Sequence, residues 1–177
     1  DAIYFRTIVD RALGHQDRVG AGWTMLDRAT RTLESWPNRY TNTQIAYYRA
    51  WALVGIGQVE EGRAGFRQLA DQIEDWASGN PEVIDNSGTQ YNLACYRSMG
   101  DEPDRAIEHW ERAVALGYGE NNSDNGWWMV DPDLESLHED NRFWVIGARL
   151  LQSSTRDERV VEPAEIEPEA AGAGGDD

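Results

Sequence analysis

Residues 91–116, YNLACYRSMGDEPDRAIEHWERAVAL, decide the fold. Their apolar residues recur at helical spacing on both sides of a break at 100–103, as expected for two helices joined by a turn. Pro103 suits the first turn of the second helix, where its missing N–H would have no partner in any case. The stretch therefore predicts an antiparallel helix pair, at about 89–99 and 103–116.

A motif within this stretch occurs twice more in the preceding sequence. It consists of a small residue, a bulky residue and a third core residue at constant spacing. The three copies are Gly22, Leu26 and Ala29; Gly62, Phe66 and Leu69; and Ala106, Trp110 and Ala113. A further small residue lies 12 positions upstream of two copies, at Ala50 and Ala94. Small residues at both sites let antiparallel helices approach closely, and the bulky residue fills the groove to the next pair.

With these motifs the chain resembles the tetratricopeptide repeat (TPR) family, in particular its bacterial members. The match is best over 91–116 and weaker over 46–70. The motif spacing of 40 and then 44 residues exceeds the roughly 34 of the standard repeat, so helices or linkers should be extended. Residues 131–143, DPDLESLHEDNRF, resemble the closing segment of many bacterial tetratricopeptide proteins. The resemblance implies an all-α fold of antiparallel hairpins stacked as a short superhelix with a C-terminal capping helix.

We therefore expect a TPR-like helical domain over 1–152 and a flexible acidic tail over 153–177. The expected hairpins span about 2–33, 42–76 and 89–116, followed by a capping unit at 127–152. Asp131 is predicted to cap a helix that starts at Pro132, and Asn141 to cap the last helix. Residues 160–177 contain only Ala, Gly, Pro, Glu, Asp, Val and one Ile, and they cannot bury enough apolar surface to offset their ordering entropy.

The composition excludes some function classes. There are 32 acidic and 16 basic residues, giving a net charge of −16, and none of the basic residues is Lys. Nucleic acid is an unsuitable partner for such a chain, because binding its phosphates needs clustered cations. No stretch approaches the length of a membrane span. We expect a soluble chain, with the cytoplasm favoured over the periplasm. The first residue, Asp1, leaves open whether it is a piece of a longer protein.

The resemblance implies binding of a protein or peptide, alone or within a larger multi-subunit complex, as an adaptor or assembly subunit. In this family the first helix of each hairpin lines a concave groove. The matching groove candidates are Gln44, Tyr47, Trp51, Val54, Tyr91, Cys95 and Ser98. The alternative is that the aromatic residues among them belong to the core. The family's binding of a terminal carboxylate uses Lys, so that mode is not expected here.

Trp127 and Trp128 are candidates for an exposed apolar patch, and the alternative is that they close the end of the core. Two adjacent Trp on one helix cannot both face inward equally.

No residue pattern indicates catalysis, a cofactor or a metal. The three His residues have no metal-binding spacing, and Cys95 reads as an inert packed thiol. The acidic run from Asp131 to Asp140 reads as helix caps on a solvated face, with Ca²⁺ binding or a carboxylate pair as the alternative. We therefore expect a scaffold and not an enzyme. A carboxylate-based enzyme and a structural spacer remain as alternatives: a strongly perturbed carboxylate in a deep pocket would favour the first, and a flat polar concave surface the second.

Overall fold

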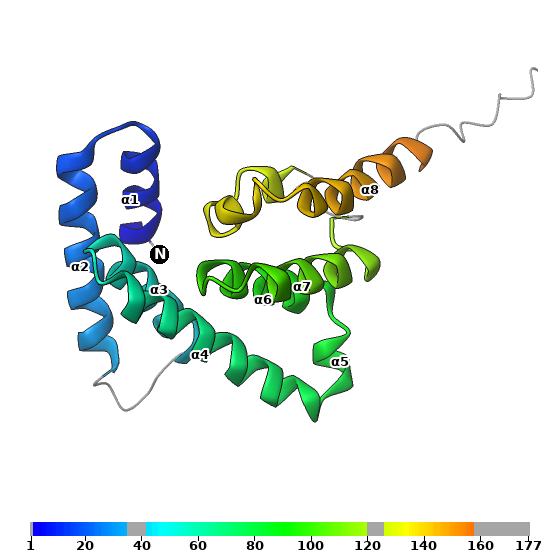
Figure 1. Cartoon of the computed structure of the whole chain (residues 1–177). Helices are drawn as coiled ribbons and strands as arrows, with labels where there is room; N and C mark the ends of the chain where they lie inside the picture. Colours follow the sequence, from blue (N-terminus) through cyan, green and yellow to red (C-terminus); the bar gives the residue numbers. More distant parts are fainter. Residues whose placement is uncertain (1, 35–41, 120–125, 158–177) are drawn as a thin grey trace, which may run out of the picture.

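The computed structural model describes residues 2–34, 42–119 and 126–157, and every regular element within these ranges is a helix (Figure 1). The elements are α1 (Ala2–Ala12), α2 (Gln16–Glu34), α3 (Asn42–Gly55), α4 (Val59–Ser78), α5 (Pro81–Ile84), α6 (Ser87–Met99), α7 (Pro103–Ala115), the 3₁₀ helices η1 (Trp127–Met129) and η2 (Pro132–Leu137), and α8 (Asn141–Asp157). The predicted all-α class is confirmed. No helix in the described ranges is both long enough and apolar enough to cross a bilayer.

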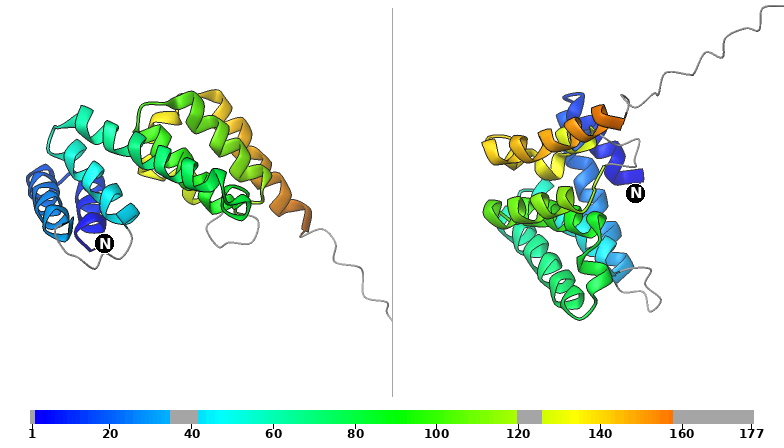
Figure 2. Two further views of the ribbon diagram at one scale, coloured as in Figure 1. Left: turned by 90° about the horizontal axis from the view of Figure 1, so that it is seen from below. Right: turned by 90° about the vertical axis from the view of Figure 1, so that its right-hand side faces the viewer.

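Helices that are adjacent in the chain pack side by side. The pairs α1 and α2, α3 and α4, and α6 and α7 form hairpins, and α4 joins the second hairpin to the third by packing against α6 (Figures 1 and 2). The C-terminal elements then cover the third hairpin, because η2 packs on α6 and α8 packs on α7. The predicted hairpin bounds of 2–33, 42–76 and 89–116 agree with these elements to within about two residues at each end, whereas the short α5 was not predicted.

The same tight turn joins the two helices of each hairpin. At its centre, Gly14, Gly57 and Asp101 have positive φ angles of 74°, 90° and 64°. In each case the next residue donates its N–H to a carbonyl five residues back, at 2.9 Å: His15 to Asp10, Gln58 to Leu53, and Glu102 to Arg97. Asp tolerates this left-handed conformation better than most residues. The internal repetition seen in the sequence therefore extends to the backbone.

The small residues of the motif lie where the helices approach most closely. A Cβ atom on Gly62 would lie 2.8 Å from the carbonyl oxygen of Ala50, on the opposing helix. That oxygen belongs to the backbone and cannot move aside, so only Gly fits. In the third hairpin Ala94 and Ala106 take these places, and both are fully buried in one core.

Two aromatic cores stabilise the chain. In the N-terminal core, made by α1 to α4, the rings of Trp23 and Trp51 stack 5.5 Å apart, and Phe66 meets Trp51 edge-on. In the C-terminal core, α6 and α7 enclose Trp110, which contacts Trp128 and Phe143. The bulky residues of the second and third motif copies are thus both at the centre of a core.

Two details of the C-terminal expectations need correction. The predicted cap Asn141 is the first residue of α8, and it is the side chain of Asp140 that accepts the N–H of Arg142 at 2.8 Å. Residues 153–157 continue α8, so the helix extends beyond the predicted start of the tail. The rest of the predicted tail, 158–177, lies outside the described residues. The predicted cap Asp131 is confirmed, because it accepts the N–H of Asp133 at 3.0 Å.

Candidate functional site

The first helices of all three hairpins meet the segment around η1 and η2 at one pocket of about 450 Å³. It is lined by Tyr4, Thr43, Gln44, Tyr47, Tyr48, Tyr91, Asn92, Cys95, Tyr96, Trp127, Asp131 and Asp133. We call it the aspartate pocket. Its lining combines six aromatic side chains with two carboxylates and, among the residues that the structure describes, includes no basic one.

The turn that opens η2 places both carboxylates in the pocket. Asp131 is the N-cap, and Pro132 fixes the first position of η2. One oxygen of Asp131 accepts the N–H of Asp133, which holds the two acidic residues side by side. Each is only 6% exposed. The Asp-Pro-Asp sequence therefore directs two negative charges inward.

Neutral groups satisfy both carboxylates. Asp131 accepts hydrogen bonds from the Tyr91 hydroxyl at 2.6 Å and from the Trp127 indole N–H at 2.8 Å. Asp133 accepts from the Tyr47 hydroxyl at 2.8 Å and from the Trp51 indole N–H at 2.9 Å. The ion pairs among the described residues all involve other carboxylates. Within the described ranges, the charge of this pair thus has hydrogen-bond donors but no counter-ion.

Burial changes the protonation of the pocket. Loss of hydration, together with the neighbouring charge of Asp131, raises the pKa of Asp133 to about 7. Burial also raises the pKa of Tyr47 and of Tyr91, and the adjacent aspartates add to the effect. The Cys95 thiol, 4.0 Å from Asp131, has its pKa raised for the same reasons. Both phenols and the thiol are therefore neutral at physiological pH, and Asp133 titrates close to it.

Replacing Asp133 with Asn is expected to stabilise the protein at pH 8 and to have little effect at pH 4. The unfolded chain releases this proton near pH 4, whereas the folded chain retains it up to about pH 7, so wild-type stability falls across that interval as the pH rises. Asn has no proton to lose and resembles the protonated acid. We expect it to raise the free energy of unfolding at pH 8 by roughly 1–3 kcal/mol.

The groups that face Asp133 and bear on its titration are Tyr4 on α1, Tyr47 on α3, Cys95 and Tyr96 on α6, and Asp131. Urea denaturation at pH 4, 6 and 8 measures the effect, with Asp75→Asn on the exposed side of α4 as the control. If the difference in unfolding free energy between Asp133→Asn and wild type stays constant with pH, Asp133 titrates as it does in a free peptide.

The groove candidates divide between the pocket and the cores. Gln44, Tyr47 and Tyr91 line the pocket together with Cys95. Trp51 is 3% exposed, and only its indole N–H is directed toward the pocket, so the expectation that its ring lies open in a groove is wrong. Val54 packs in the N-terminal core.

The remaining candidates are also separated. The Ser98 hydroxyl is buried and bonded to that of Ser136 at 2.7 Å, away from the pocket. Trp127 is 47% exposed at the pocket rim, whereas Trp128 is 1% exposed in the C-terminal core. They therefore do not form a joint patch. Adjacent side chains on the short helix 127–129 point in different directions, so only one of the two indoles lies inside.

The sequence reading missed the inner part of the site. Asp131 and Asp133 were expected on a solvated face, and this is wrong, because both are buried among aromatic rings. Tyr4 was also missed, although its hydroxyl bonds to that of Tyr47 at 2.9 Å. A signal was present in the form of two acidic residues around a proline just after a Trp pair, but the tyrosines that bond to them lie 40 and 86 residues away in the chain.

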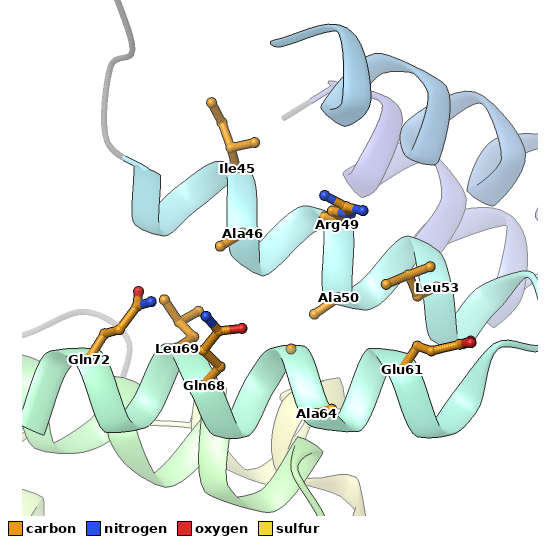
Figure 3. Close-up of a pocket in the computed structure, with 11 residues that line it drawn as sticks. Ile45, Ala46, Arg49, Ala50, Leu53, Glu61, Ala64, Gln68, Leu69 and Gln72 are labelled. Atoms are coloured by element: carbon orange, nitrogen blue, oxygen red, sulfur yellow. The ribbon is translucent and has the colours of Figure 1, made fainter. Parts of the chain in front are cut away.

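A larger pocket, of about 730 Å³, lies between α3 and α4 (Figure 3). Its lining includes Ala46 and Ala50 on α3 and Gly65 and Leu69 on α4. Its charged lining residues are Arg49 and Glu61, whereas the two buried aspartates lie in the smaller pocket.

Within the described ranges, no three His, Cys, Asp or Glu side chains lie close enough together to hold a metal ion. The chain matches no protein-family model, and neither a curated protein nor a solved structure is detectably similar to it. Its function is therefore inferred from the geometry of the aspartate pocket.

Proposed function

We propose that the chain is a tetratricopeptide-type scaffold, with its hairpins arranged as a short superhelix, that binds a segment of a partner protein in the aspartate pocket. The observation that carries the proposal is the convergence of α1, α3 and α6 on one aromatic pocket. These are the first helices of the three hairpins, which the resemblance places on the concave side. The recurrent turn at Gly14, Gly57 and Asp101 supports a repeat array.

The lining suits a protein segment. Tyr and Trp are the residues that most often anchor a binding interface, and the volume of about 450 Å³ lies in the range of ligand pockets. Thr43, Gln44 and Asn92 are exposed at the rim, where their polar groups can meet a peptide backbone. A spacer domain would have no need of such a pocket, so the aromatic lining favours the binding function.

Peptides selected from a random display library on the full chain test this proposal. We expect Trp127→Ala to weaken the binding of pocket-directed peptides by roughly five- to a hundredfold, as for an interface anchor. The matched control is Trp76→Ala, which removes another exposed Trp, on α4 and outside the pocket lining. Melting curves check that both variants are folded. If both variants bind every selected peptide as tightly as wild type, the pocket is not the binding site.

One observation favours an enzyme as the second candidate. The pKa of Asp133 is raised by burial to about 7, as is common for acid–base groups in active sites. A panel of model esters and glycosides tests this candidate: turnover that is lost in Asp133→Asn would support the enzyme over the scaffold.

A further inference from the structure

We propose that the group bound in the aspartate pocket is a cation, the side chain of an Arg or Lys in the partner segment. This inference rests on the proposed binding function and specifies the chemistry of its ligand. Three features of the pocket carry it: its uncompensated charge, its aromatic faces and its neutral rim.

The charge has no internal partner among the described residues. The side chains that donate to Asp131 and Asp133 are all neutral: four Tyr or Trp groups, and the Cys95 thiol at 4.0 Å. Arg11 reaches η2, but its guanidinium pairs with Glu135 at 2.9 Å, on the outside of that helix. A buried carboxylate without a counter-ion is costly, and a cation entering from solvent would offset that cost.

The aromatic side chains supply a second attraction for the same ligand. Tyr4, Tyr47, Tyr48 and Tyr96 form one cluster, in which the ring centroids of Tyr47 lie 5.3 Å from those of Tyr48 and 5.7 Å from those of Tyr96. Cations bind over such rings at centroid distances of up to about 6 Å. Arg and Lys also carry an apolar stem that packs against the rings while the charged end reaches the carboxylates.

The neutral rim makes the site selective for a cation within a peptide. Thr43, Gln44 and Asn92 carry no charge, and within the described part of the lining the charged groups are the two aspartates below them. An acidic ligand would meet these two charges without a compensating group. A purely apolar side chain would leave them buried and still unpaired.

To test the inference, the affinity of a library-selected peptide is measured with and without its basic residue, on wild type and on Asp133→Asn. We expect Arg or Lys at a fixed position in peptides whose binding depends on Trp127. Replacing that residue by uncharged citrulline or norleucine should weaken binding to wild type at least tenfold. On Asp133→Asn the same replacement should change binding less than threefold, because the cation can then no longer pair with the Asp133 carboxylate.

General attraction to a chain of net charge −16 could also enrich basic peptides. Glu108→Gln controls for it, because it removes one exposed negative charge from α7, outside the pocket lining. We expect this variant to bind within twofold of wild type and to keep the full citrulline effect. Measurements at about 0.5 M salt weaken the surface attraction more than the buried pair.

The outcomes separate the two proposals. Either of two results would overturn the cation inference and leave the scaffold proposal intact. In the first, peptides whose binding depends on Trp127 carry no basic residue. In the second, Asp133→Asn and Glu108→Gln reduce the effect of replacing the basic residue equally. An absence of peptides that depend on Trp127 would overturn both proposals. If Asp133→Asn proves unfolded in a melting curve, Tyr48→Leu replaces it, because that change removes a π-face while keeping the apolar volume.

Discussion

The Trp51→Ala variant is expected to lose roughly 3–5 kcal/mol of unfolding free energy, the usual cost of removing a large buried aromatic side chain. Trp51 is 3% exposed, stacks on Trp23 at 5.5 Å and meets Phe66 edge-on. Its indole N–H also donates to Asp133, so the change leaves a buried carboxylate with one donor fewer. Urea denaturation at pH 7 measures the loss.

Two controls make this result specific. Trp76→Ala removes a Trp that is 59% exposed, and it should cost less than about 1 kcal/mol. Trp51→Phe keeps most of the ring contact and loses the N–H, so it should fall between the two. If Trp51→Ala is as stable as wild type, the assignment of the Trp51 ring to the core is contradicted and an open groove position is supported.

The helices were predictable because their ends are marked locally. Breaks at Gly57 and at 100–103 lie at the helix ends, and the Gly62 motif requires the close approach that the structure has. Gly100 directly precedes the turn residue Asp101, and a Cβ on it would lie 2.9 Å from Cγ of Arg67, whose guanidinium donates to the Gly100 carbonyl at 2.7 Å. Asp101 takes the left-handed conformation that Gly14 and Gly57 have in the other two turns.

The orientation of the aromatic stripe was not predictable in the same way. Helical spacing shows that Tyr47 and Trp51 share a face of α3, but it does not show what covers that face. The cover comes from the preceding helix α2 through Trp23 and from η2 through Asp133, which is 82 residues from Trp51 in the sequence. These contacts close off the face that was predicted to be an open groove. Tyr47 lies in the wall of the resulting pocket, and Trp51 lies behind it.

The aspartates were misjudged for the same reason. An acidic residue before a proline is an ordinary helix cap, and Asp131 does serve as one. Its second role, accepting from Tyr91 on α6, depends on a contact between residues 40 positions apart. The same segment reaches the first hairpin through Arg11 and Glu135, so the pocket exists only when the C-terminal elements fold back onto α1 and α3.

The Arg97→Met variant is expected to lose roughly 3–5 kcal/mol of unfolding free energy, because it removes one member of a buried charge network. The Arg97 side chain is fully buried where α6 packs on α4. Its guanidinium lies 2.6 Å from Asp71, 2.7 Å from Glu74 and 2.6 Å from Glu102. Met has similar length but no charge, so the three carboxylates would keep only the partly exposed Arg105 beside them, at 2.6 Å from Glu74 and 3.7–3.8 Å from Asp71 and Glu102.

Arg105→Met is the matched control, because Arg105 reaches the same Glu74 at 2.6 Å from a side chain that is 44% exposed. Water screens that pair, so its loss should cost about 1 kcal/mol or less. Urea denaturation at pH 7 measures both variants. Equal losses for the two arginines would mean that side-chain packing and not charge joins α4 to α6.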